Sequence, residues 1–175
     1  METKKQKINL IEIYPVIKEK IDNGGTVQLP ITGKSMRPLL VWGRDTVEIV
    51  KCESPKKGDI IFYLRDNGQF VLHRIIGTDE KGYVLCGDNQ WVKEYGIKDH
   101  NIIAVVRSIT RKGKVLEVAT NIPYRIYSNV WMAMMPIRKP VLRFTRKVKP
   151  VLKKIILKLG LGKLFLKLGL INNLK

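Results

Sequence analysis

Residues 59–77 have the sequence DIIFYLRDNGQFVLHRIIG, and this stretch carries the clearest structural signal in the chain. Two runs rich in β-branched and aromatic residues, 59–64 and 70–77, flank a turn at Asp66-Asn67-Gly68. An Asn-Gly pair supplies the positive φ angles that tight hairpin turns require. The stretch therefore predicts two antiparallel strands joined by a hairpin turn, with His73 inside the second strand.

Five further runs of strand type lie on either side of this hairpin. They span residues 26–31, 45–51, 83–86, 102–110 and 114–118. An amphipathic helix is expected at residues 10–21, ahead of the stop signal Asn23-Gly24-Gly25. Many short strands with glycine-containing turns predict a compact, mainly β fold of sandwich or barrel type with a short N-terminal helix.

The basic charge is concentrated in the C-terminal third of the chain. The 175 residues include 33 Lys and Arg against 15 Asp and Glu, a formal net charge of +18. All 15 acidic residues precede residue 118, whereas residues 118–175 hold 13 basic residues and no acidic one. We therefore expect an N-terminal helix at 1–24, a β domain at 25–120 and a cationic, amphipathic extension at 121–175.

From Pro140 onward, apolar and basic residues fall in opposite sectors of a helical wheel, and Pro150 is expected to split this segment into two short helices. Two interpretations stay open for residues 138–175. They bind an anionic membrane surface, or their apolar face packs on the β domain. Nucleic acid is disfavoured as a partner because leucines, rather than aromatic or base-reading polar side chains, accompany the basic residues after Phe144.

Targeting and metal-binding signals are weak. The start of the chain does not have the pattern of a signal peptide, and no stretch reaches the ~20 apolar residues that span a bilayer. We expect a cytoplasmic protein, with peripheral contact at the inner face of the cell membrane as an option. Cys52 and Cys86 form no metal-ligand grouping with histidine, and no metal or other cofactor is expected.

Ser35 and His73 are the candidate reactive pair. Ser35 follows a strand-like run and precedes Pro38, so its hydroxyl is expected at an exposed turn on a rigid element. His73 is the histidine inside an apolar run. Ser35 would attack a peptide carbonyl, and His73 would take its proton and pass it to the leaving amine. Each pattern alone is more commonly structural, and the case depends on their order and on Gly87-Asp88-Asn89.

Four motifs occur in one order along residues 25–110. They are Gly33-x-Ser35-Met36-x-Pro38-x-Leu40, Lys57-Gly58-Asp59-Ile60-Ile61, His73-Arg74-Ile75-Ile76 and Gly87-Asp88-Asn89. This ordered set resembles the signal-peptidase/LexA-like serine peptidases. Bacterial signal peptidases and LexA-type repressors have a lysine base, and the histidine here resembles the archaeal and endoplasmic-reticulum type of signal peptidase.

The resemblance implies a coiled, barrel-like β-sheet fold and a serine endopeptidase that cleaves a leader or pro-segment. It leaves two candidates for the acid that orients His73: Asp88, which is favoured, and Glu94, near where related enzymes carry a second acid. Backbone N–H groups around Ser35 would hold the oxyanion. An extended peptide would add as a strand between two segments. Those segments are Leu29-Pro30-Ile31 and Gln69-Phe70-Val71.

Two other functions stay open. One is a LexA-like regulatory switch without its own DNA-binding domain, because only 34 residues precede Ser35. The other is a non-catalytic adaptor at a membrane surface, in which the basic extension is essential and Ser35 is not. The sequence indicates neither the substrate nor a cleavage-site preference.

Overall fold

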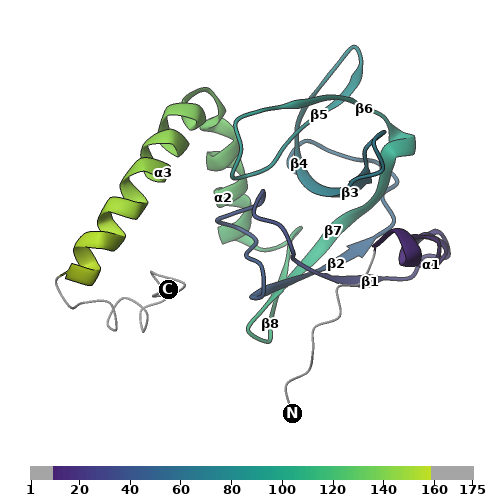
Figure 1. Ribbon diagram of the computed structural model, residues 1–175. Coiled ribbons are helices and arrows are strands. Elements are labelled where there is room, and N and C mark those ends of the chain that lie inside the picture. The colour runs from purple at the N-terminus through teal and green to yellow at the C-terminus, as the bar shows by residue number, and fades with distance from the viewer. Residues whose placement is uncertain (1–9, 159–175) are drawn as a thin grey trace. The chain divides into compact units, whose positions relative to one another are not determined.

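The computed structural model describes residues 10–158, which form mainly β structure with three α-helices (Figure 1). The helices are α1 (Leu10–Asp22), α2 (Ile122–Ala133) and α3 (Met135–Lys158). The strands are β1 (Val27–Pro30), β2 (Asp45–Val50), β3 (Ile60–Leu64), β4 (Phe70–Asp79), β5 (Gly82–Cys86), β6 (Glu94–Ile97), β7 (Ile102–Arg111) and β8 (Lys114–Glu117). The mainly β class expected from the sequence is confirmed.

All eight strands belong to one antiparallel sheet in the order β1-β2-β7-β3-β4-β5-β6, with β8 paired to β7. β7 is shared between two parts of the sheet, because residues 102–105 pair with β3 and residues 105–111 pair with β2. Register shifts at Glu48/Ile49 and Phe62/Tyr63 interrupt these ladders, and such bulges bend a strand and increase its twist.

Among the described residues, the sheet does not close into a barrel. Closing a barrel requires hydrogen bonds between the two end strands. Here β1 and β6 are the ends of the strand order, and the ladders of the described chain do not join them. The sheet is therefore open.

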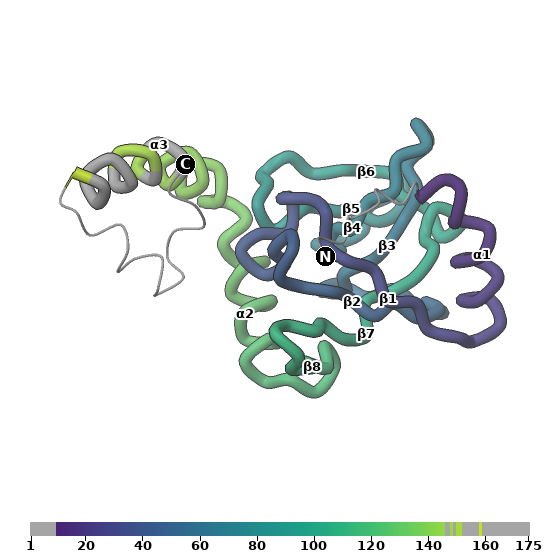
Figure 2. The backbone as a smooth tube through the Cα atoms, turned by 60° about the horizontal axis from the view of Figure 1, so that its bottom comes forward, coloured from purple at the N-terminus to yellow at the C-terminus, as the bar shows by residue number. Residues whose placement is uncertain are grey.

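The core lies on both faces of β3. Ile60 and Phe62 belong to a large apolar cluster, which also contains Ile17 and Ile21 of α1. The alternate residues Ile61 and Tyr63 belong to a second, smaller cluster, as the two-residue period of a strand dictates. α1 lies beside β1 and β7 (Figures 1 and 2) and covers part of the large cluster.

The chain divides into two compact units, with the boundary between Met135 and Pro136. α2 belongs to the unit that contains the sheet, whereas the sequence-based division at residue 120 grouped it with the extension. Residues 1–9 of the expected segment 1–24 and residues 159–175 of the expected extension lie outside the described residues.

α3 continues through Pro140 and Pro150, so the expected split at Pro150 was wrong. Proline removes one N–H donor, but its fixed φ angle is close to that of a helix. The helix therefore continues past Pro150 without that hydrogen bond. In the part of the chain that the structure describes, no helix is both long enough and apolar enough to cross a membrane.

Candidate active site

Ser35 begins a run of turns that follows β1, and the neighbouring residues anchor this loop. Met36 and Leu40 are buried in the large apolar cluster on the C-terminal side of Ser35, which is itself partly exposed. The Leu40 N–H donates to the Met36 carbonyl at 2.9 Å. Apolar burial on one side and local turns thus hold the Ser35 backbone in place while its side chain keeps access to solvent.

Asp45 closes the far end of the same loop. Its carboxylate accepts hydrogen bonds from the Val41 N–H (2.8 Å) and from the guanidinium groups of Arg44 and Arg111. Both guanidinium groups also donate to the Leu39 carbonyl. Burial opposes ionisation of Asp45, but the hydrogen bonds from Arg44 and Arg111 outweigh it and hold the pKa of this carboxyl below its usual range.

His73 lies on β4 with its ring almost fully buried. Its Nδ1 atom is 2.9 Å from Oε1 of Glu94 and 3.3 Å from the Tyr63 hydroxyl. The Tyr63 hydroxyl donates to Oε2 of Glu94 at 2.7 Å. An ionised carboxylate only accepts hydrogen bonds, so Nδ1 carries the donated proton, and Nε2 is the ring nitrogen that can accept one.

Gly87 lies where the serine loop meets the histidine ring. A Cβ atom built on Gly87 would be 2.7 Å from the Ser35 carbonyl oxygen and 3.0 Å from His73 Nε2. Those two atoms are therefore no farther apart than the sum of these distances. Only glycine permits this close approach without movement of the serine loop.

Asn89 ties the serine loop to the Gly87-Asp88-Asn89 motif. Its backbone N–H donates to the Ser35 carbonyl at 2.6 Å, and its side-chain amide donates to the Lys34 carbonyl at 3.2 Å. Among the described residues, no hydrogen bond joins the Ser35 hydroxyl to His73. Catalytic hydrogen bonds in enzymes are often long without substrate and tighten when substrate binds. The structure thus brings the Ser35 backbone beside the basic nitrogen of His73.

Glu94 is the carboxylate that contacts His73. It lies at the start of β6, opposite Leu85 of β5, and also accepts hydrogen bonds from the Arg65 guanidinium. Burial opposes its ionisation, but hydrogen bonds from His73, Arg65 and Tyr63 outweigh this and hold the pKa of Glu94 well below its usual range. Burial of the Tyr63 hydroxyl, and next the Glu94 carboxylate, raise the pKa of Tyr63, which therefore stays a protonated donor.

Asp88, the acid that the sequence favoured for the histidine, lies elsewhere in the site. Both oxygens of its buried carboxylate pair with one edge of the Arg74 guanidinium, at 3.0 Å from Nε and 2.9 Å from Nη2. The Tyr127 hydroxyl donates to it at 3.1 Å, and the Trp131 indole N–H donates to the Asp88 carbonyl oxygen at 2.8 Å. Asp88 therefore supports the motif that contains Gly87 instead of contacting the histidine ring.

Arg74 joins three of the sequence motifs and α2. Besides Asp88, it donates to the Gly58 carbonyl (2.8 Å), the Tyr124 hydroxyl (3.0 Å) and the Ser128 hydroxyl (2.8 Å). Sequence reasoning assigned Arg74 no role of its own. The sequence feature that could have indicated this role is a charged residue inside the apolar run Val71–Ile76. An arginine that is fully buried in such a strand requires a charged partner and further acceptors.

The two expected substrate segments lie beside strand edges. β1 is an end strand, and residues 70–73 of β4 pair with β3 but precede the β4–β5 ladder, which starts at Arg74. Within each segment the side chains differ. Pro30 and Gln69 are exposed, Val71 packs on the smaller apolar cluster, and Leu29 and Phe70 pack on the large one. Ile31 is buried, and its N–H already donates to the Asp45 carbonyl.

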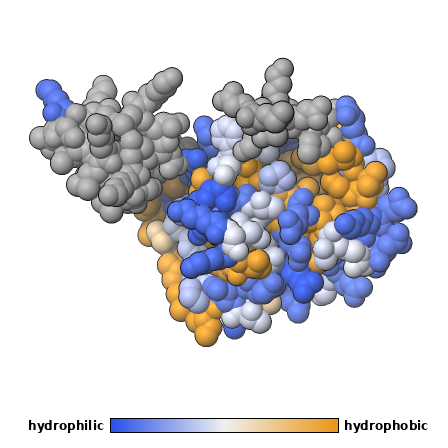
Figure 3. Space-filling model, turned by 90° about the horizontal axis from the view of Figure 1, so that it is seen from below, coloured by the Kyte–Doolittle hydropathy of each residue, from blue (hydrophilic) through white to orange (hydrophobic). Residues whose placement is uncertain are grey.

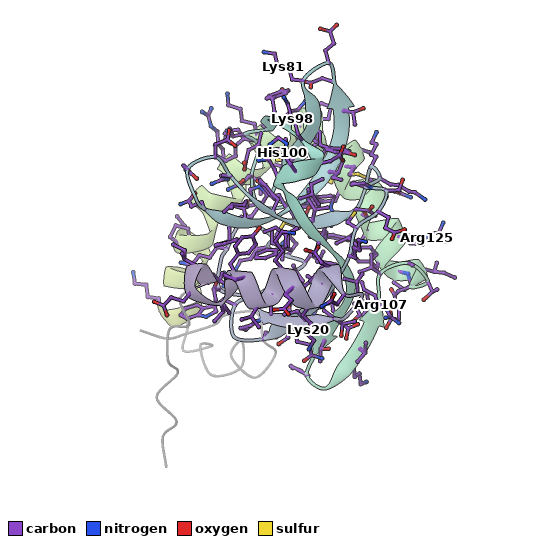
Figure 4. The ribbon with its side chains drawn as sticks, turned by 90° about the vertical axis from the view of Figure 1, so that its right-hand side faces the viewer. Lys20, Lys81, Lys98, His100, Arg107 and Arg125 are labelled. Carbon is purple, nitrogen blue, oxygen red and sulfur yellow. The ribbon has the colours of Figure 1, made fainter. Side chains whose placement is uncertain are left out.

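Other titratable groups lie apart from this site. His100, in the short 3₁₀ helix η1 (Asp99–Asn101), is exposed near Lys81 and Lys98 (Figure 4). Within residues 10–158, no group of three or more His, Cys, Asp or Glu side chains is placed to hold a metal ion.

Comparisons with known proteins gave no match to a protein-family model, a curated protein or a solved structure.

We expect the stability of the wild-type protein, relative to a Glu94→Gln variant, to fall as the pH drops below about 4. Because the pKa of Glu94 is lowered in the folded state, its ionised form stabilises the fold fully above the ordinary carboxyl pKa. That contribution is lost as the pH falls toward the folded-state pKa. Urea unfolding of both proteins at neutral pH and at pH values of about 3 measures the change.

Glu53→Gln is the matched control, because the Glu53 side chain is 82% exposed and its nearest cation, Lys51, is 3.8 Å away. This control is expected to show little difference from wild type at either pH. A Glu94→Gln difference that stays constant or grows at acid pH would contradict the assigned hydrogen bonds.

Proposed function

We propose that the protein is a serine endopeptidase in which Ser35 is the nucleophile, His73 the general base and Glu94 the acid that orients the histidine. The observation that supports this most is the position of the His73 ring. One ring nitrogen donates to Glu94 at 2.9 Å, and the other lies beside Gly87 and the Ser35 carbonyl. This is the order of groups that activates a serine hydroxyl.

The chemistry follows from these positions. Ser35 Oγ bonds to the peptide carbonyl carbon as its proton moves to His73 Nε2, and the negative charge of Glu94 stabilises the imidazolium that forms. The C–N bond then breaks, and Nε2 returns the proton to the leaving amine. Water, deprotonated by the same nitrogen, hydrolyses the acyl-enzyme and restores the Ser35 hydroxyl.

Glu94 is preferred to Asp88 as the third member because Asp88 has other partners. Both Asp88 oxygens bond to Arg74, whereas Glu94 contacts the nitrogen that must donate. Tyr63 and Arg65 hold the Glu94 carboxylate and keep it ionised. The side chain of glutamate is one methylene longer than that of aspartate, and it reaches His73 from β6.

Backbone N–H groups near Ser35 are the proposed oxyanion donors. In the described chain, the N–H groups of Ser35 and Met36 have no intramolecular acceptor, whereas the Arg37 N–H donates to the Lys34 carbonyl. Two unpaired N–H groups at the nucleophile are what a tetrahedral intermediate requires.

The proposed substrate is an extended peptide, such as a leader or pro-segment, which adds as a strand at β1 and at residues 70–73 of β4. Unpaired strand edges in both segments support this, and so does the open, bent sheet, which is compatible with the coiled-sheet fold of the signal-peptidase/LexA-like peptidases. Within these segments, Ile31 would contribute its carbonyl and not its N–H, which is already bonded to Asp45.

The test is a search for peptide cleavage. The purified protein is incubated with a diverse peptide library, and new termini are identified by mass spectrometry. We expect a defined set of cleavages with wild type that is absent with Ser35→Ala. Ser54→Ala is the matched control, because Ser54 is exposed in a turn outside the site.

The proposal is wrong if Ser35→Ala yields the same cleavages as wild type, since they would then come from a contaminant or another site. A folded protein that cleaves no peptide, alone or with anionic vesicles, would instead favour the non-catalytic adaptor.

A further inference from the structure

α3 exposes a stripe of apolar side chains. Ile137, Phe144, Val148 and Val151 are all exposed, from 37% for Val148 to 68% for Phe144. At 100° per residue, these four positions fall within a sector of about 60° on one side of the helix. A continuous apolar stripe on a surface helix indicates a face that binds something.

The charge of the same segment identifies the chemistry of the partner. Residues 136–175 contain 12 Lys and Arg and no Asp or Glu, and nine of the basic residues belong to α3. This part of the sequence therefore has a large net positive charge. A partner must therefore accept an apolar stripe and also present many negative charges.

We propose that α3 binds the surface of an anionic lipid bilayer, with its axis in the plane of the membrane. The stripe of Ile137, Phe144, Val148 and Val151 enters the boundary between headgroups and acyl chains, and the basic side chains other than the buried Arg138 contact lipid phosphates. A helix of 24 residues is about 36 Å long and can lie along the surface. Nucleic acid would neutralise the charge but would leave the apolar stripe in water.

A second helix presents a similar stripe. Ile122, Ile126 and Val130 of α2 are each more than half exposed and lie at i, i+4 and i+8 on one helix face. Apolar patches reach the surface between charged areas (Figure 3). α2 belongs to the unit that contains the sheet, so that unit has an exposed apolar stripe of its own.

The experiment is vesicle flotation with the full-length protein. We expect binding to phosphatidylcholine vesicles that contain phosphatidylglycerol, at least about tenfold weaker binding to phosphatidylcholine alone, and weakening by salt. A triple variant, Phe144→Ser, Val148→Ser and Val151→Ser, is expected to lose about a hundredfold or more in affinity, because each buried methylene contributes to insertion.

Val115→Ser is the matched control, because Val115 is 62% exposed on β8, outside both stripes. It should bind vesicles as wild type does, and so should Ser35→Ala, since the inference does not depend on peptidase activity. Circular dichroism checks that every variant remains folded.

Three results would overturn the proposal. The first is equal binding to neutral and anionic vesicles. The second is unchanged binding by the triple variant. The third is no binding to either kind of vesicle. Binding to duplex DNA would then indicate a nucleic-acid partner, and slow hydrogen exchange of the α3 amides would indicate intramolecular packing.

Discussion

Alanine at Ser35 or at His73 is expected to lower kcat/KM by about 10⁴-fold to 10⁶-fold, and both changes together are expected to cost no more than either alone. In serine peptidases a nucleophile and its base act as one unit, because a serine without a base and a base without a nucleophile are both ineffective. The contacts at Gly87 bring the Ser35 backbone and His73 Nε2 close enough for such a unit. The assay uses the fastest peptide from the library.

Glu94→Gln extends this measurement. Glutamine has the same length and can still accept a hydrogen bond from Nδ1, but it does not carry the charge that stabilises the imidazolium. We expect an intermediate loss of about 10²-fold to 10⁴-fold in kcat. Additive losses in kcat/KM for Ser35→Ala and His73→Ala would show that the two side chains act separately. A Glu94→Gln variant with the kcat of wild type would exclude Glu94 as the orienting acid.

Arg74→Met is expected to lower the free energy of unfolding by about 3–5 kcal/mol. Methionine keeps the apolar bulk but leaves the Asp88 carboxylate buried without its cation. It also removes the donor to the Gly58 carbonyl and to the α2 hydroxyls of Tyr124 and Ser128. Urea unfolding at neutral pH measures the change.

Two further variants make the Arg74 result interpretable. Arg107→Met is the matched control, because the Arg107 side chain is 57% exposed and its ion-pair distances are 3.9 Å, and it should cost about 1 kcal/mol or less. Adding Asp88→Leu to Arg74→Met removes the isolated charge and should restore part of the loss. If Arg74→Met costs no more than the control, the pair does not hold the motif in place.

The fold class could be predicted from local signals because most strands carry them. The turn at Asn67-Gly68 and the β-branched runs beside it predicted β3 and β4 to within a few residues. β6 was missed because Glu94-Tyr95-Gly96-Ile97 is short, includes glycine and has no alternating pattern. Its strand conformation depends on pairing with β5, a contact that the local sequence does not encode.

The candidate site was only partly predictable for a related reason. Ser35 and His73 are recognisable from the motifs around them, and both lie at the site. The choice between Asp88 and Glu94 depends on the register of β6 against β5, which places Glu94 opposite Leu85 and within reach of His73. The role of Arg74 could not be predicted for the same reason, because its partners Tyr124 and Ser128 lie on α2, 50 and 54 residues later in the chain.

Gly87 limits how this protein can evolve. Even the single methyl group of alanine would come within 3.0 Å of three atoms, one of them the Ser35 carbonyl oxygen. Any amino-acid replacement of this glycine therefore requires the serine loop or the histidine environment to move as well. Sequence change is accordingly expected at the strand edges of the proposed substrate segments, while position 87 stays glycine.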